Sequence, residues 1–222
     1  MRMARHLLAI GLLAAALIAP PVSAAAASAP TADQLLAKLG ATCQAVTKKP
    51  LRPKDGAARS VSVCGMNGAV YAKTGLLVDC DGQRTTQCNE KTDCCFQNDT
   101  AFHQSDGKPL NAAALPYIVL PEDSGNWHWP KQGIGGGSVA AVIYHHHLTY
   151  AVVGDTDVPD KVPQGSYATA KALGMNPDPR HGGVDGGVTY LIFENATADP
   201  IESHASAVTV GQRAAEAFLA HN

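Results

Sequence analysis

The amino-acid sequence predicts a mainly β fold of the α+β class, a small barrel or sandwich with a short N-terminal helix and a C-terminal helix. Short apolar runs rich in β-branched and aromatic residues recur along the chain, and Gly, Pro, Asn and Asp separate them. Such runs are typical of strands, and many short strands with few helices indicate a barrel or sandwich. The predicted strands are residues 61–64, 69–72, 76–79, 117–120, 139–144, 148–153 and 188–193.

Three segments carry helix signals. Thr31 and Gln34 have the spacing of a capping box ahead of a leucine-rich stretch, so we expect a short helix that starts there and ends at Gly40. Residues 166–174 combine a cap residue, helix formers and a terminal glycine, which predicts about two helical turns. Residues 210–221 place apolar side chains on one face and predict the C-terminal helix.

The N-terminal segment has the pattern of a secretory signal peptide. Arg2 and Arg5 precede an apolar run over residues 7–18, and small residues lead up to Ala24. The apolar run is too short to span a bilayer comfortably, which argues against a membrane anchor. We therefore expect a secreted, extracellular protein that is not attached to a membrane after cleavage.

This interpretation divides the chain into a signal peptide (1–24), a linker (25–34) and a single catalytic domain (35–222). Removing residues 1–24 takes away two of the 17 basic residues and none of the 19 acidic ones, so the formal charge changes from −2 to −4. No cluster of Lys and Arg is long enough to neutralise several phosphates, which argues against a nucleic-acid partner. We expect a monomer.

Six cysteines lie in the first half of the exported chain, at positions 43, 64, 80, 88, 94 and 95. In an oxidising compartment an even number of cysteines indicates disulfides, for which 15 pairings exist. Repeated Cys-x-x-Cys pairs are absent from the sequence, so we expect no metal site. Because Cys94 and Cys95 are adjacent, a bond between them would be strained, and we expect each to have a distant partner.

Two pairs of carboxylates follow predicted strands. Asp79 and Asp81 flank a cysteine, and in an extended chain their side chains point to the same side. Asp155 and Asp157 follow the apolar run 148–153, where a carboxylate is held by the strand and still reaches solvent. Both segments are also compatible with ordinary turns or a helix cap.

Other motifs favour structural roles. Adjacent histidines point in different directions, so residues 145–147 indicate an exposed hairpin tip rather than a metal site. The glycine-rich segment 133–137 precedes a strand and lacks a following lysine, which indicates a loop and not a nucleotide site. No Gly-x-Ser-x-Gly motif supports a serine nucleophile. We expect no cofactor.

Eight segments, in the same order, resemble the chitosanases of glycoside hydrolase family 75, over about residues 35–220. The matching stretches are 63–71 (VCGMNGAVY), 78–82 (VDCDG), 115–121 (LPYIVLP), 137–144 (GSVAAVIY), 150–156 (YAVVGDT), 166–174 (SYATAKALG), 187–190 (GVTY) and 200–203 (PIES). The resemblance implies a small closed β-barrel of the double-psi type. It also implies a secreted enzyme that hydrolyses the β-1,4 links of chitosan, from within the chain, with inversion.

In the family, the aspartate of the Gly-Asp-Thr motif and a glutamate nine residues later form the catalytic pair. The resemblance therefore assigns Asp155 as one catalytic residue, whereas the glutamate position is occupied here by Gln164. An amide cannot act as an acid or base near neutral pH. Chitosan carries cationic amines that acidic residues attract. We predict that the substrate contacts are made by Asp79, Asp81, Asp157, Ser166 and Tyr167.

The departure at Gln164 leaves three hypotheses. In the first, the protein is an active chitosanase in which Asp157, Asp160, Asp79 or Asp81 takes over the task of the glutamate. In the second, it is a degenerate member that binds chitosan or a related amino-polysaccharide without cleaving it. In the third, it is a related glycosidase that acts on a cell-wall polysaccharide.

Overall fold

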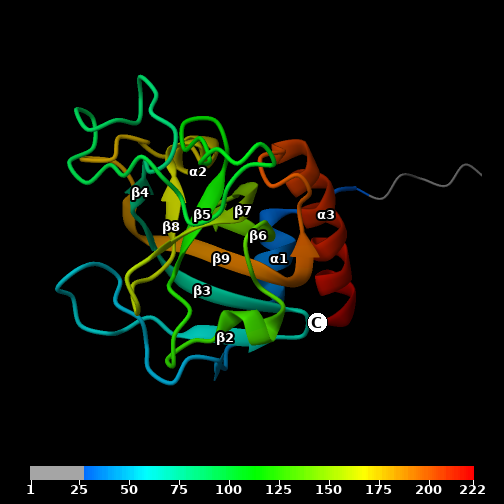
Figure 1. The fold of residues 1–222 in the computed structure, drawn as a ribbon. Helices are drawn as coiled ribbons and strands as arrows, with labels where there is room; N and C mark the ends of the chain where they lie inside the picture. Colours follow the sequence, from blue (N-terminus) through cyan, green and yellow to red (C-terminus); the bar gives the residue numbers. More distant parts are fainter. Residues whose placement is uncertain (1–27) are drawn as a thin grey trace, which may run out of the picture.

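The structure is a computed structural model and describes residues 28–222. Within this range the chain forms one nine-stranded mixed sheet, three α-helices and one 3₁₀-helix (Figure 1). The mainly β prediction is therefore confirmed. The predicted signal peptide lies outside the described residues. No helix of the described part is both long and apolar enough to cross a membrane.

The helices and strands follow one another in this order along the chain. They are α1 (Ala32–Lys38), β1 (Gln44–Ala45), β2 (Val63–Met66), β3 (Ala69–Leu76), β4 (Val78–Asp79), β5 (Tyr117–Pro121), η1 (Trp129–Gln132), β6 (Ser138–Tyr144), β7 (His147–Asp157), β8 (Gln164–Ser166), α2 (Tyr167–Ala172), β9 (Val184–Thr197) and α3 (His204–His221).

The sheet is open, so the prediction of a closed barrel is wrong. Its strand order is β1-β2-β3-β9-β6-β7-β5-β8-β4, and the two edge strands, β1 and β4, do not pair with each other. Each edge strand has only two residues, too few to supply the continuous hydrogen-bond ladder that closure requires. All nine strands belong to the same sheet, so a sandwich of two sheets is not formed either.

All seven predicted strands overlap observed ones, but several boundaries differ. β7 continues through the acidic residues to Asp157, and β9 has 14 residues where the apolar run predicts six. These extensions consist mainly of polar residues and glycine, so hydrophobicity did not reveal them. The hairpin tip predicted at the histidine triplet is present: His145 and His146 form the turn between β6 and β7, and His147 begins β7 opposite Tyr144.

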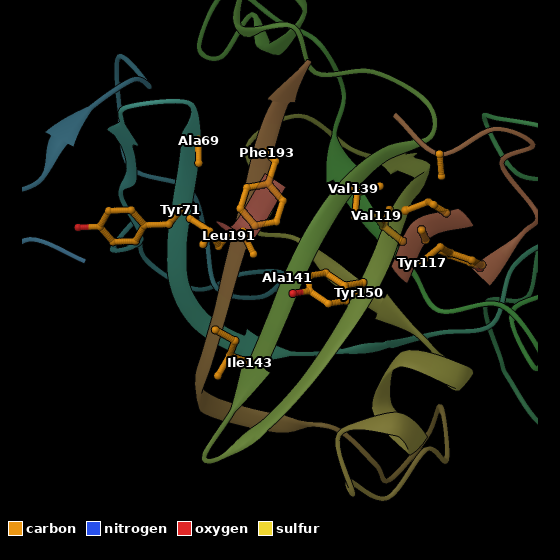
Figure 2. Close-up of a cluster of buried hydrophobic side chains, with 14 of the residues drawn as sticks. Ala69, Tyr71, Tyr117, Val119, Val139, Ala141, Ile143, Tyr150, Leu191 and Phe193 are labelled. Atoms are coloured by element: carbon orange, nitrogen blue, oxygen red, sulfur yellow. The ribbon is translucent and has the colours of Figure 1, made fainter. Parts of the chain in front are cut away.

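Both faces of the central strands are buried, which explains why their sequences are apolar without interruption. In β6, Val139, Ala141 and Ile143 belong to one hydrophobic cluster, and the alternate residues belong to a second. Figure 2 shows the first cluster, including the side chains contributed by β5 and β9. Helices α1 and α3 cover this face and contact each other (Figure 1), whereas α2 and two buried tryptophans cover the other.

The helix predictions are confirmed with changed limits. The capping box of Thr31 and Gln34 is present at α1, although this helix begins inside the segment predicted as a linker. α3 begins at His204, where Ser203 caps it, six residues before the predicted start. The ring of Phe218 packs edge-on against Phe193 at 6.4 Å between centroids, which anchors α3 to the sheet.

Four of the six cysteines form disulfides, Cys43 with Cys64 and Cys80 with Cys88. The prediction of distant partners for Cys94 and Cys95 is wrong, because the other four cysteines pair among themselves. Both remain free thiols at the protein surface.

Candidate active site

A bulge in β7 determines where Asp155 points. β5 pairs in parallel with β7, and the register shifts by one residue, from Ile118 opposite Val153 to Val119 opposite Asp155. Gly154 is the additional residue. Because side chains alternate along a strand, this single insertion moves Asp155 onto the face of Tyr117 and Val119 instead of the opposite one.

Only a glycine fits at the bulge. A Cβ atom on Gly154 would lie 2.7 Å from both Leu110 Cδ1 and Tyr117 Cβ. Tyr117 and Val119 lie next to each other in the first cluster (Figure 2). The glycine of the Gly-Asp-Thr motif therefore lets β5 and the chain at Leu110 approach β7 closely enough to surround the aspartate.

Asp155 lies in a cleft of about 660 Å³ between β4, β7, β8 and the loops around them. The lining includes seven aspartates but only two basic residues, Lys161 and Arg180. The aspartates of the lining are Asp55, Asp79, Asp81, Asp93, Asp99, Asp155 and Asp157. The chain as a whole is nearly neutral, so the negative charge is concentrated at this cleft.

The deepest part of the cleft holds three carboxyl groups. One oxygen from each of Asp79, Asp81 and Asp155 lies within 4.8 Å of the other two. The Tyr117 hydroxyl donates to Asp79 Oδ2 at 2.5 Å and lies 2.9 Å from the carbonyl oxygen of Asp81. Burial, followed by the charge of Asp81, raises the pKa of Asp79 well above its usual range despite this hydrogen bond.

The pKa of Asp81 is raised as well. Burial is the main cause that raises the pKa of Asp81 to about 7, with a contribution from the charge of Asp155. The backbone N–H of Gln97, which donates to Asp81 Oδ1 at 2.6 Å, acts in the opposite direction. Near neutral pH the group therefore exchanges a proton readily, which is the property that acid–base catalysis requires.

Asp155 is 6% exposed, which corrects the expectation that it reaches freely into solvent after the end of a strand. Its Oδ1 accepts hydrogen bonds from the backbone N–H groups of Ala101 and Thr156, both at 2.7 Å. Burial nevertheless raises the pKa of Asp155, because it outweighs these two donors. The other oxygen, Oδ2, has no hydrogen bond within the described part of the chain and is free for a ligand.

Asp157 lies on the same face two residues further on, in a different environment. Its carboxylate forms an ion pair with Lys161, and its Oδ2 accepts from the Gln164 side-chain amide at 2.5 Å. The Val158 N–H donates to Oδ1 at 2.6 Å. Burial acts to lower the pKa of Lys161, but the Asp157 and Asp55 carboxylates together outweigh it and the pKa is raised. Lys161 therefore stays cationic beside the Asp157 carboxylate.

Gln164 lies on the third strand of this face. β8 pairs with β5 so that Gln164 is opposite Val119, whose other neighbour is Asp155. Two strand spacings of about 4.8 Å separate the two backbones, about 10 Å in total. The resemblance to the family assigns the positions of Asp155 and Gln164 as the catalytic pair, and in the sheet these two residues lie on either side of Val119. Gln164 is 9% exposed and lines the cleft.

Ser166 and Tyr167 are not brought to the cleft. Ser166 is fully buried, and its hydroxyl accepts from the backbone N–H of Thr169, which caps α2, and donates to the carbonyl of Leu115. Tyr167 packs against the first cluster. Asp160 also lies outside the cleft lining, where it binds Arg59 and Asn126.

Several residues that line the cleft or bind its carboxyl groups carry no signal in the sequence. Tyr117 belongs to an apolar run, and Gln97 contributes through its backbone. Lys161 is four residues after Asp157, a spacing that has no meaning outside a helix. Their proximity depends on the pairing of β5 with β7 and β8, which no local pattern encodes.

Two groups of side chains in the described residues could each offer three metal ligands, namely Asp79 with Asp81 and Asp155, and Asp93 with Cys94 and Cys95. The absence of a metal from the reaction stays a prediction.

Comparison with known proteins gives a family for the chain. Residues 76–219 match the family described as fungal chitosanase of glycosyl hydrolase group 75. No curated protein matches the chain. The matched segment contains every residue of the acidic cleft except Asp55. The chain belongs to the group 75 glycosyl hydrolases, the fungal chitosanase family.

Proposed function

We propose that the protein is a secreted, monomeric hydrolase that cleaves β-1,4 links within chitosan by inversion, with Asp155 as the acid and Asp157 as the base. The family supports a glycosidase that acts on a polysaccharide. The observation that carries the proposal is the contrast between two carboxyl groups on one strand face. Burial raises the pKa of Asp155, so this group tends to keep its proton, whereas the Asp157 carboxylate forms an ion pair with Lys161.

This pair suits an inverting reaction. Such an enzyme needs an acid that protonates the leaving oxygen and a base that activates water, with carboxyl groups ~6.5–9.5 Å apart. Residues two apart in a strand have Cα atoms about 6.6 Å apart and side chains on the same face, so carboxyl groups that extend side by side are spaced near the lower limit of this range. Asp79 and Asp81 approach Asp155 within 4.8 Å, which leaves no room for the water.

The other two carboxyl groups have supporting roles in the proposal. Asp79 and Asp81 lie beside Asp155, where burial, with a smaller contribution from the neighbouring carboxylates, raises the pKa of both. When they are ionised, they attract the cationic amines of chitosan along a cleft that carries few positive charges.

Replacement of single carboxylates tests the assignment. Asp155→Asn and Asp157→Asn are each expected to lower kcat on chitosan by ~10²–10⁴-fold, the usual contribution of an acid or base. Asp106→Asn, an exposed aspartate outside the cleft, is the matched control and should retain activity. NMR of the first product should show the α-anomer. Equal rates for Asp157→Asn and wild type would refute the role of Asp157, and a β-anomer would refute inversion.

Gln164 favours a second candidate, a degenerate member that binds the polysaccharide without cleaving it. The amide occupies the position of the family's glutamate and is committed to a hydrogen bond with Asp157. This candidate predicts that wild type binds chitosan without releasing reducing ends, and that Gln164→Glu creates activity. If wild type releases reducing ends and Asp155→Asn does not, the degenerate candidate is excluded.

A further inference from the structure

Two free cysteines form part of the wall of the acidic cleft. Cys94 and Cys95 are exposed and line the same cavity as Asp81 and Asp155. Their Sγ atoms are 3.0 Å apart, closer than two sulfurs that pack without interacting. They lie in the long loop after β4, drawn in green above that strand in Figure 1.

The surrounding chain holds this dithiol in place. The Cys95 N–H donates to Asp93 Oδ1 at 3.0 Å, and the Gly82 N–H donates to the carbonyl of Gln97 at 2.9 Å. On the other side, Arg180 donates to the carbonyl of Lys91 at 2.7 Å. The segment 91–97 is thus fixed at both ends, and the remaining cysteines are already engaged in disulfides. Each of the two thiols has only the other as a partner within the described chain.

We infer that Cys94 and Cys95 form a reversible dithiol–disulfide site on the cleft wall, oxidised by small disulfides such as oxidised glutathione. The thiolate of one cysteine attacks the small disulfide and releases one glutathione. The second thiolate then attacks the mixed disulfide, closes the Cys94–Cys95 bond and releases the second glutathione. In total, two protein thiols are oxidised to one disulfide, and their two electrons and two protons reduce one glutathione disulfide to two glutathione thiols.

The bond is labile because the residues are adjacent. Consecutive Cα atoms lie about 3.8 Å apart, whereas disulfides ordinarily span ~4.4–6.8 Å and are easier to reduce outside that range. The Cα separations of Cys43–Cys64 and Cys80–Cys88, 5.0 and 5.1 Å, lie within it. The site therefore opens under conditions that leave both structural disulfides closed.

The first attack depends on pH. The Cys94 sulfur, through the hydrogen bond between the two thiols and then through the negative charge of its thiolate form, raises the pKa of Cys95, and the Asp93 and Asp81 carboxylates add to this effect. The Cys95 thiolate is therefore scarce at neutral pH, and attack by Cys95 accelerates as the pH rises.

The Cys94–Cys95 site is also connected through the chain to the carboxyl group of Asp81. Gln97, two residues after Cys95, donates its N–H to Asp81. Closure of a ring across the 94–95 peptide changes the path of the chain that presents this donor. The rate of chitosan hydrolysis is therefore expected to differ between the two oxidation states, a consequence that rests on the proposed function.

Thiol trapping tests the chemistry without reference to activity. The protein is equilibrated in buffers of reduced and oxidised glutathione, blocked with N-ethylmaleimide, and analysed by intact mass and by the tryptic peptide that begins at Thr92. We expect two maleimide adducts on this peptide in reducing buffer and none in oxidising buffer, without bound glutathione. Cys94→Ser, in contrast, should carry one glutathione on Cys95. Two glutathione adducts on wild type, a covalent dimer, or free thiols throughout would overturn the inference.

Hydrolysis rates complete the test. Wild type should change its rate at least twofold between the oxidised and reduced states, whereas the double variant Cys94→Ser/Cys95→Ser should not respond. Equal wild-type rates in both states would overturn the link to Asp81. Absence of hydrolysis in every state would refute the proposed function instead, and the trapping result would remain valid.

Discussion

Replacement of Gly154 by alanine tests how the bulge builds the site. The added Cβ would lie 2.7 Å from Leu110 Cδ1 and from Tyr117 Cβ. The methyl group of Leu110 can move, but Tyr117 cannot. Its strand, β5, is paired with β7 on one side and β8 on the other, and the Tyr117 hydroxyl donates a hydrogen bond to Asp79. We therefore expect a cost near the upper end of the usual range for overpacking, about 2–3 kcal/mol.

Urea unfolding measures this cost. With a slope of about 2.5 kcal/mol per M, the midpoint of Gly154→Ala should fall by about 1 M. The hydrolysis rate should fall by about 10²-fold, since a displacement of about 1 Å at the acid has this effect.

The control for this experiment is another glycine of the sheet. Gly186 lies in β9 with open space around it, so Gly186→Ala should stay within about 0.5 kcal/mol of wild type or gain slightly. If Gly154→Ala matches this control in both midpoint and rate, the argument that only glycine fits beside Tyr117 is refuted.

Three further predictions concern charge and capping. The pKa of Asp81 is raised to about 7 in the folded protein, above the ordinary aspartate value of 3.8. Its contribution to stability is therefore present below about pH 4 and lost as the pH rises through about 7. Asp81→Asn should therefore gain stability relative to wild type over this window, and a difference in urea midpoint that does not change with pH would contradict this. Ser166→Ala removes a buried cap and its hydrogen bonds, so it should lose about 1–3 kcal/mol of unfolding free energy; a large change in KM with no loss of stability would instead indicate substrate contact. Added salt should raise KM for chitosan, because the attraction to the aspartates is screened, and a KM independent of salt would exclude that attraction.

The fold was predictable where burial follows a local pattern. The seven apolar runs became strands because β-branched and aromatic side chains fill both faces of the central sheet. The prediction failed where polar residues continue a strand, as at Asp155 and Asp157 in β7, because backbone pairing with β5 does not require apolar side chains. The prediction of a closed barrel also failed. The edge strands β1 and β4 are too short to pair with each other and close the sheet.

The site was predictable in its acidic residues but not in their arrangement. Asp79, Asp81, Asp155, Asp157 and Gln164 all line the cleft, and their roles in binding and catalysis stay predictions. Ser166 belongs to an equally recognisable motif, yet it is a structural cap. A sequence motif shows which residues occur together. It does not distinguish a side chain that contacts the ligand from one, such as Ser166, that caps a neighbouring helix.

The sequence by itself determined the family, the strands and the acidic residues, because composition and motif order are local properties. Tertiary structure alone decided what those residues can do. The bulge at Gly154 turns Asp155 toward Asp79 and Asp81, where burial raises its pKa, and the chain at Lys161 places an ammonium group beside the Asp157 carboxylate. Protonation depends on solvent exclusion and on charges contributed by distant segments, and both arise only when those segments pack together.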